Sequence, residues 1–278
     1  MNAFRSVCNR TFWRGLNIQG LLLIGLVFMP VIVFGQQKAN DTPIYQRDPA
    51  NLPEAIAKVR SGDFLGIHVE MIAHFKAVEA IPALEKQFDL TQDRQTKAEI
   101  ASALVRLGDK DDRYWHFLVN LALPVIVSDE PDPFAYDEHG KTNGTVSPGL
   151  VAWAQSHNMP LPKAASEAFT GVYDGLGHLA DTGDPRGIPL LRRALKSPNF
   201  ITVQLAAQGL AQAKDKDSIP LIIEACKRAP ADAADSIVRA LIFFDDSNAQ
   251  NAVNTYMRPD AAKAYRDGRA NGLSVTPF

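Results

Sequence analysis

The chain has 278 residues and a formal net charge of −2, with 46% hydrophobic and 22% charged residues. This composition excludes an intrinsically disordered protein, because the chain carries enough apolar residues to build a core. The near-neutral charge provides no general attraction to nucleic acids or to anionic membranes, so we expect no nucleic-acid partner.

The first 35 residues have the pattern of an export signal. Arginines precede an almost uncharged apolar run over 16–34, and the run ends in a small residue, Gly35. This pattern predicts a signal peptide over 1–35, a polar linker over 36–50, and a periplasmic or secreted protein. The alternative is an uncleaved anchor, because a run of this length just suffices to cross a bilayer. In that case the protein would contact the membrane only through this segment.

Four copies of one dipeptide, an apolar residue followed by proline, open apolar runs of helical period. The copies are Leu52-Pro53, Ile81-Pro82, Ile188-Pro189 and Ile219-Pro220. Within the first two and within the last two, the spacing is roughly 30 residues, which is typical of stacked helical hairpins. Proline is tolerated in the first turn of a helix, because the amide hydrogen that it lacks would have no partner there. Each dipeptide therefore predicts the first helix of a hairpin.

The apolar positions of the predicted second helices repeat in the same register. Two successive stripes are Val203, Ala206, Ala207 and Leu210, and then Ala234, Ile237, Val238 and Leu241. Their spacing predicts amphipathic helices that bury one face against their neighbours. We therefore predict an all-α fold, an α-solenoid of about five to six helical hairpins over 51–258, with 259–278 as a C-terminal cap.

One turn and the helix after it resemble a known repeat family. The stretch Gly183-Asp184-Pro185-Arg186-Gly187-Ile188-Pro189-Leu190-Leu191 is similar to HEAT-like repeats of the short type named after phycobilisome lyases. The resemblance covers about Asn51 to Met257, with one interruption. It implies a right-handed superhelix with a concave groove and protein partners. Members of this family range from chromophore-lyase subunits to plain scaffolds, and we find no chromophore-handling motif in this chain.

The interruption is an insertion over 124–161, after which helical period resumes at Ala165. It contains acidic residues, prolines and glycines, and then a short helical piece around Trp153. Insertions in repeat proteins lie on one face of the stack, often the binding face. Two interpretations involve its aromatic residues. Either the insertion is a surface loop whose Phe134 and Trp153 fold onto neighbouring helices, or it is a partner-binding lip with Phe134, Tyr136 and Trp153 as anchors.

A third interpretation of the insertion is a metal site. The candidate ligands are Asp132, Asp137, Glu138 and His139, which offer carboxylate oxygens and one imidazole. Their spacing matches neither the calcium loop of an EF-hand nor a zinc motif.

The sequence contains no Ser-His-Asp arrangement around a nucleophile elbow, no glycine-rich phosphate loop and no Cys-x-x-Cys pair. We therefore expect no cofactor and predict a non-catalytic scaffold or adaptor that binds protein partners. The alternative is an enzyme or a lyase-like accessory subunit, which would use the acidic insertion as a metal or acid–base site. Cys226 lies at helical spacing from Ile219 and Ile222 and is predicted to be a small buried hydrophobic residue.

Overall fold

The computed structural model describes residues 48–270, which are mostly helical and include one small sheet. This confirms the predicted all-α class. The predicted signal peptide, most of the linker and the last eight residues of the predicted cap lie outside the described residues. Within residues 48–270, no helix combines the length and the apolar character that a membrane span requires.

The four apolar–proline dipeptides each begin a helix, as predicted. These helices are α1 (Leu52–Ser61), α3 (Ile81–Leu90), α9 (Ile188–Ala194) and α11 (Ile219–Arg228). In each of them the apolar residue is the first residue of the helix and the proline is the second. Short 3-10 turns precede them, over Pro49–Asn51, Val78–Ala80, Pro185–Gly187 and Lys216–Ser218. The repeated dipeptide therefore marks one recurring element, a 3-10 turn that continues into a helix.

Each of these helices packs against the helix that follows it. The second helices are α2 (Gly66–His74), α4 (Arg94–Arg106), α10 (Phe200–Gln212) and α12 (Ala231–Val238), the last continued by η6 (Arg239–Phe243). The described chain ends in α13 (Ser247–Tyr256) and α14 (Pro259–Ala270), which also contact each other. The segment predicted as a cap thus begins with a helix that packs on α13 and η6.

The middle pair of helices is the one that the insertion interrupts. Its first helix is α5 (Asp112–Val127), and its second part consists of α7 (Ala165–Val172), the π-helical turn η3 (Tyr173–Gly177) and α8 (His178–Asp181). Close contact between the two parts requires glycine in η3, because a Cβ on Gly175 would clash with the side chain of Val125 on α5.

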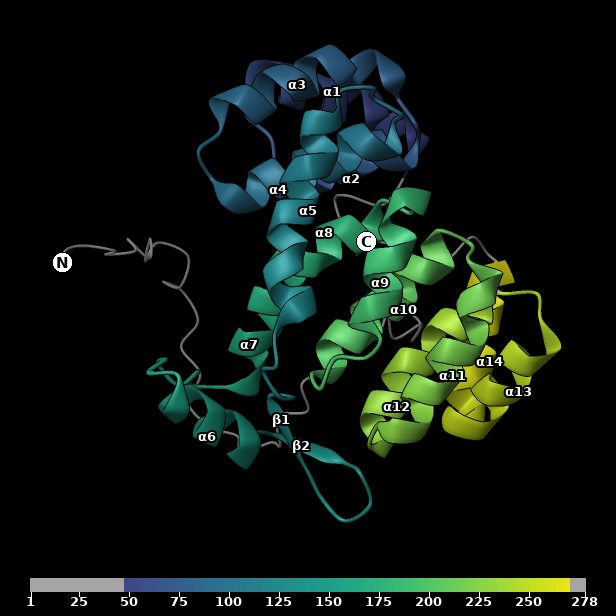
Figure 1. Cartoon of the computed structure of the whole chain (residues 1–278). Helices are drawn as coiled ribbons and strands as arrows, with labels where there is room; N and C mark the ends of the chain where they lie inside the picture. The colour runs from purple at the N-terminus through teal and green to yellow at the C-terminus, as the bar shows by residue number, and fades with distance from the viewer. Residues whose placement is uncertain (1–47, 271–278) are drawn as a thin grey trace, which may run out of the picture.

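The second helices pack in series along the molecule. Helix α2 contacts α4, α4 contacts α8, α8 contacts α10, and α10 contacts α12. Among the first helices, α1 contacts α3, α5 contacts α9, and α11 contacts α13. In Figure 1 the pairs accordingly follow one another from α1–α4 at the top, through α5 and α8–α10, to α11–α14 at the lower right.

The predicted apolar stripes form the core. Val203, Ala206, Ala207 and Leu210 are fully buried, as are Ile237, Val238 and Leu241, and Ala234 is 3% exposed. Cys226 is buried in the same core, as predicted, and burial raises the pKa of its thiol to about 12. The thiol is therefore protonated at neutral pH and unreactive there.

The insertion differs from the prediction in its start and in its structure. Helix α5 continues through Pro124 to Val127, so the insertion begins at Ser128 and not at residue 124. Buried apolar residues on both sides of this proline, Leu121 and Ile126, hold the helix together where a backbone hydrogen bond is lost. The insertion contains an antiparallel pair of strands, β1 (Phe134–Tyr136) and β2 (Thr142–Val146), which was not predicted from the sequence. The predicted helical piece is α6 (Pro148–Ser156).

Candidate functional site

A buried carboxylate, that of Asp132, attaches the β1–β2 hairpin to the start of α10. Its Oδ1 accepts hydrogen bonds from the backbone N–H of Phe134 at 2.9 Å and from the hydroxyl of Tyr136 at 3.1 Å. Its Oδ2 accepts from the backbone N–H of Phe200 at 2.8 Å. Phe200 is the first residue of α10, where amide groups lack partners within the helix and favour a negative charge. Burial raises the pKa of Asp132, and these hydrogen bonds oppose that rise.

A second attachment joins the far end of the hairpin to α12. The carboxylate of Asp232 accepts from Nζ of Lys141 at 2.8 Å and from the backbone N–H of Thr142 at 2.9 Å. The backbone N–H of Asp232 donates to the carbonyl oxygen of Gly140 at 3.0 Å. Gly140 has a φ of 72°, and a Cβ there would clash with the backbone of Ala231. The hairpin therefore spans the N-terminal ends of two successive second helices.

The four predicted metal ligands do not come together. Asp132 is buried at the root of the hairpin, whereas Asp137, Glu138 and His139 are exposed in its turn. Oδ1 of Asp137 accepts from the backbone N–H groups of His139 and Lys141, at 2.9 and 2.8 Å. These bonds shape the turn. In the part of the chain that the structure describes, no three His, Cys, Asp or Glu side chains are grouped so that they could hold a metal ion.

Replacing Asp132 with Ala should detach β1–β2 from α10 and destabilise the protein by about 1–3 kcal/mol, because buried donors lose a charged acceptor. Hydrogen exchange followed by mass spectrometry should show faster exchange over 134–146 and unchanged exchange in α1–α4. The matched control is Glu138→Ala, which removes an exposed carboxylate from the same hairpin. Unchanged protection of 134–146 in the Asp132 variant would contradict the assigned role.

The three predicted aromatic anchors occupy different environments. Phe134 packs against the main core, and the hydroxyl of Tyr136 is bound to the buried carboxylate described above. Trp153 lies on α6, where its ring stacks on His157 with the ring centroids 4.4 Å apart. Its Nε1–H donates to Oδ1 of Asp129 at 2.9 Å. Phe134 therefore packs onto the main core, Tyr136 stabilises the root of the hairpin, and Trp153 belongs to α6.

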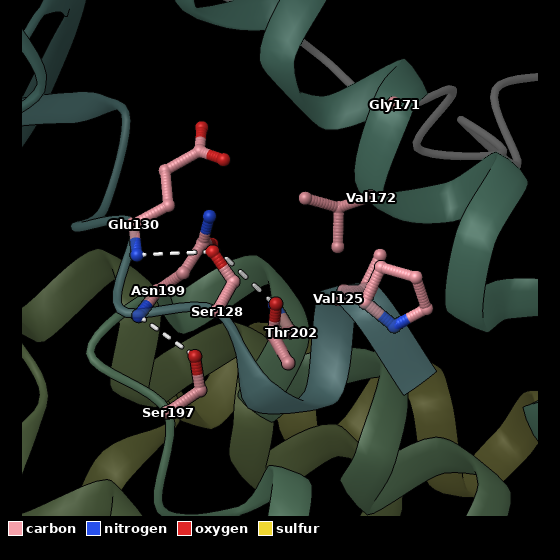
Figure 2. Close-up of a pocket in the computed structure, with 9 residues that line it drawn as sticks. Val125, Ser128, Glu130, Gly171, Val172, Ser197, Asn199 and Thr202 are labelled. Atoms are coloured by element: carbon pink, nitrogen blue, oxygen red, sulfur yellow. Dashed lines mark hydrogen bonds between the residues drawn. The ribbon is translucent and has the colours of Figure 1, made fainter. Parts of the chain in front are cut away.

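A cavity of about 340 Å³ lies at the root of the insertion, and we call it the root pocket (Figure 2). Its lining comes from α5, the first residues of the insertion, α7 and the start of α10. The lining residues used below are Val125, Ser128, Glu130, Gly171, Val172 and Thr202. No short segment of sequence contains this set, so the sequence offered no local signal for the pocket.

A second polar site connects α2, α4 and α8, and no pattern in the sequence predicted it. The guanidinium of Arg106 on α4 makes a two-point contact with the carboxylate of Glu70 on α2, with 3.1 Å between Nη2 and Oε1. The hydroxyl of Tyr173 in η3 donates to Oδ2 of Asp181 on α8 at 3.2 Å. A cavity of about 290 Å³ is lined by Glu70, Arg106 and Thr182, among others.

The carboxyl group of Asp181 is the most perturbed acid of this second site. Burial raises its pKa to about 7; the charge of Arg106 lowers the pKa, and that of Glu70 raises it further. His178, one turn earlier on α8, is buried, and burial lowers its pKa to about 4. Its Nε2 has no hydrogen-bond partner among the residues that the structure describes. Perturbed groups of this kind, next to a π-helical turn, are common at functional sites.

No protein-family model, no curated protein and no solved structure matches this chain. The resemblance to HEAT-like repeats therefore stays a prediction from the sequence. The assignment of a function depends on the geometry of the described residues.

Proposed function

We propose that the protein is an exported, non-catalytic scaffold, built as a HEAT-like α-solenoid, that binds a protein partner through its insertion. The serial packing of the second helices supports the solenoid, because each helix pair buries its apolar face against the next pair. The apolar run before residue 35 supports export. The observation that best supports a binding role is the exposed apolar surface at the insertion.

This surface is made by α6, by the loop after it and by the last residue of α5, just before the insertion. Val127, Met159 and Leu161 are 54%, 53% and 46% exposed, and Trp153 on α6 is partly exposed. Exposed apolar side chains that gather on one part of a protein mark interaction sites, and tryptophan is enriched among the residues that dominate binding energy. Figure 1 shows α6 at the edge of the molecule, apart from the stacked helix pairs.

A crosslinking pull-down from the native envelope tests this proposal. The informative variant replaces 148–161 with a Gly/Ser linker and retains β1, β2 and the attachments through Asp132 and Asp232. We expect the intact protein to capture a partner that this variant loses. A control variant, Leu221→Ser, alters an exposed apolar residue on α11 and should capture the same partner as the intact protein. Capture of the same partners without α6 would contradict recognition by the insertion, and capture of none by any version would contradict the scaffold.

The alternative function, that of an enzyme, was first assigned to the acidic residues of the insertion. The structure favours another residue for that role. Asp132 is committed to hydrogen bonds within the fold, and the acidic turn of the hairpin is exposed. Asp181 would be the acid–base group of such an enzyme, because a pKa of about 7 lets a carboxyl group exchange its proton near neutral pH. An enzyme of this kind would lose its activity in the Asp181→Asn variant, whereas partner capture by the scaffold would persist.

A further inference from the structure

The root pocket contains a carboxylate without a counter-ion. Within residues 48–270, the side chain of Glu130 makes no ion pair and no hydrogen bond, and its backbone N–H donates to Oγ of Ser128 at 3.1 Å. None of the residues that line the pocket is Lys, Arg or His. Burial raises the pKa of Glu130, and no neighbouring cation offsets this effect. A cation that entered the pocket would therefore gain a carboxylate partner, and its charge would oppose the effect of burial on the pKa of Glu130.

The rest of the pocket suits a long side chain with an apolar stem. Val125 and Val172 provide an apolar wall, and Ser128 and Thr202 add hydroxyl groups to the lining of the pocket (Figure 2). The volume of about 340 Å³ falls at the lower end of the range of ligand pockets. On α7, Gly171 leaves one side open, since an added Cβ there would meet no atom within 4 Å.

The pocket adjoins the surface to which we assign partner binding. Asp129, the neighbour of Glu130, accepts the hydrogen bond of Trp153 at 2.9 Å. On the other side, Pro131 lies near the first turn of α6, because a Cβ added to Gly149 would be 3.7 Å from its side chain. A protein that covers Trp153 would therefore have the pocket within reach of its own side chains.

We propose that the root pocket binds a lysine or arginine side chain of the protein partner, with Glu130 as the counter-ion. This inference rests on the proposed scaffold function. The aliphatic stem of the bound side chain lies along Val125 and Val172, and its cationic head reaches the carboxylate of Glu130. The partner therefore carries an exposed basic residue at the site where it meets α6.

Two variants test the pocket in different ways. Glu130→Gln removes the charge and keeps the shape of the side chain. Gly171→Leu adds a large side chain to the lining of the pocket on α7, where an added Cβ would meet no atom within 4 Å and where a helix accommodates leucine better than glycine. The matched control is Glu224→Gln, which removes an exposed carboxylate on α11. Thermal unfolding of each variant verifies that it is folded before binding is measured.

The binding probes are capped pentapeptides with a central Lys, Arg or norleucine between pairs of alanines. They are titrated into the full-length protein and followed by NMR of the amides of Ser128, Glu130 and Thr202. We expect the Lys and Arg peptides to shift these resonances and to bind about tenfold more tightly than the norleucine peptide. Glu130→Gln and Gly171→Leu should each abolish this preference, and Glu224→Gln should retain it. Equal binding of the norleucine peptide, or no shift with any peptide, would overturn the inference.

The same variants separate this inference from the proposed function. If the pull-down captures a partner through α6, and Glu130→Gln and Gly171→Leu capture it equally well, the pocket inference fails and the scaffold stands. If the Lys peptide binds in the pocket but the intact protein captures no partner, the pocket is a cation site and the scaffold fails.

Discussion

Replacing Leu210 with Ala should lower the free energy of unfolding by about 2–5 kcal/mol, the range for a leucine deleted from a packed core. Leu210 is fully buried on α10, and this helix packs against α8, α9 and α12. Leu241, the equivalent position one repeat later, is also fully buried and should show a loss of the same size. Urea denaturation measures both variants.

The control for these variants is Leu221→Ala on α11, where leucine is 41% exposed and the change should cost less than about 1 kcal/mol. The repeat register predicts this larger loss of stability at the buried positions than at the exposed one. Unchanged stability in both the Leu210 and the Leu241 variants would show that the register is wrong.

Replacing Asp181 with Asn should stabilise the protein at alkaline pH and have little effect at acidic pH. In the folded state the pKa of Asp181 is about 7, above the value of 3.8 that it has in the unfolded chain. The folded state therefore binds this proton more tightly, and stability falls as the pH rises between these two values. The full shift in pKa would lower the free energy of unfolding by roughly 4 kcal/mol between acidic and alkaline pH. Because Asp181 is partly exposed, solvent screening reduces this loss to about 2 kcal/mol. Asn has no charge and retains an acceptor for the hydroxyl of Tyr173.

The effect of His178 on stability should become measurable in the same Asp181→Asn variant, because the titration of His178 changes stability in the direction opposite to that of Asp181. Its pKa is about 4 in the folded state and 6.5 in the unfolded chain, so its contribution to stability is lost as the pH falls between these values. In the native protein the two effects oppose each other over this range. The variant should therefore lose stability on acidification more steeply than the native protein. Thermal midpoints measured from about pH 8 to about pH 4 test this, and parallel profiles would contradict it.

The helices and their starting positions could be predicted from the sequence because their signals are local. Each apolar–proline dipeptide places proline in the first turn of a helix, and this position is favourable whatever the rest of the fold is. The apolar positions within Val203–Leu210 and Ala234–Leu241 indicate the buried face of each helix, since only the face that meets its neighbours needs to be apolar.

The β1–β2 hairpin could not be predicted because its support comes from distant parts of the chain. Strands as short as Phe134–Tyr136 show no clear alternation of apolar and polar residues, and a two-stranded sheet alone is barely stable in water. Asp132 binds the amide of a residue 68 positions away, and Asp232 binds one that is 90 positions away. An acidic residue in a loop can hold a metal, shape a turn or cap a helix, and only tertiary contacts distinguish these roles.

The candidate sites depend even more on tertiary structure. Arg106 and Glu70 are 36 positions apart and belong to different helix pairs, so neither predicts the other. The pKa of Asp181 depends on burial between helices, which the residue type does not reveal. The partner-binding role of Trp153 stays a prediction, which rests on the general enrichment of large aromatic side chains among residues that dominate binding energy.

The measurement that tests the scaffold most directly is site-specific photo-crosslinking in the native envelope. A photoreactive amino acid is placed at Ala152, an exposed position on α6, and in a parallel protein at Leu221 on α11. Recognition by the insertion predicts one dominant protein adduct from position 152 and none from position 221. The same adducts from both positions, or adducts from position 221 alone, would contradict it.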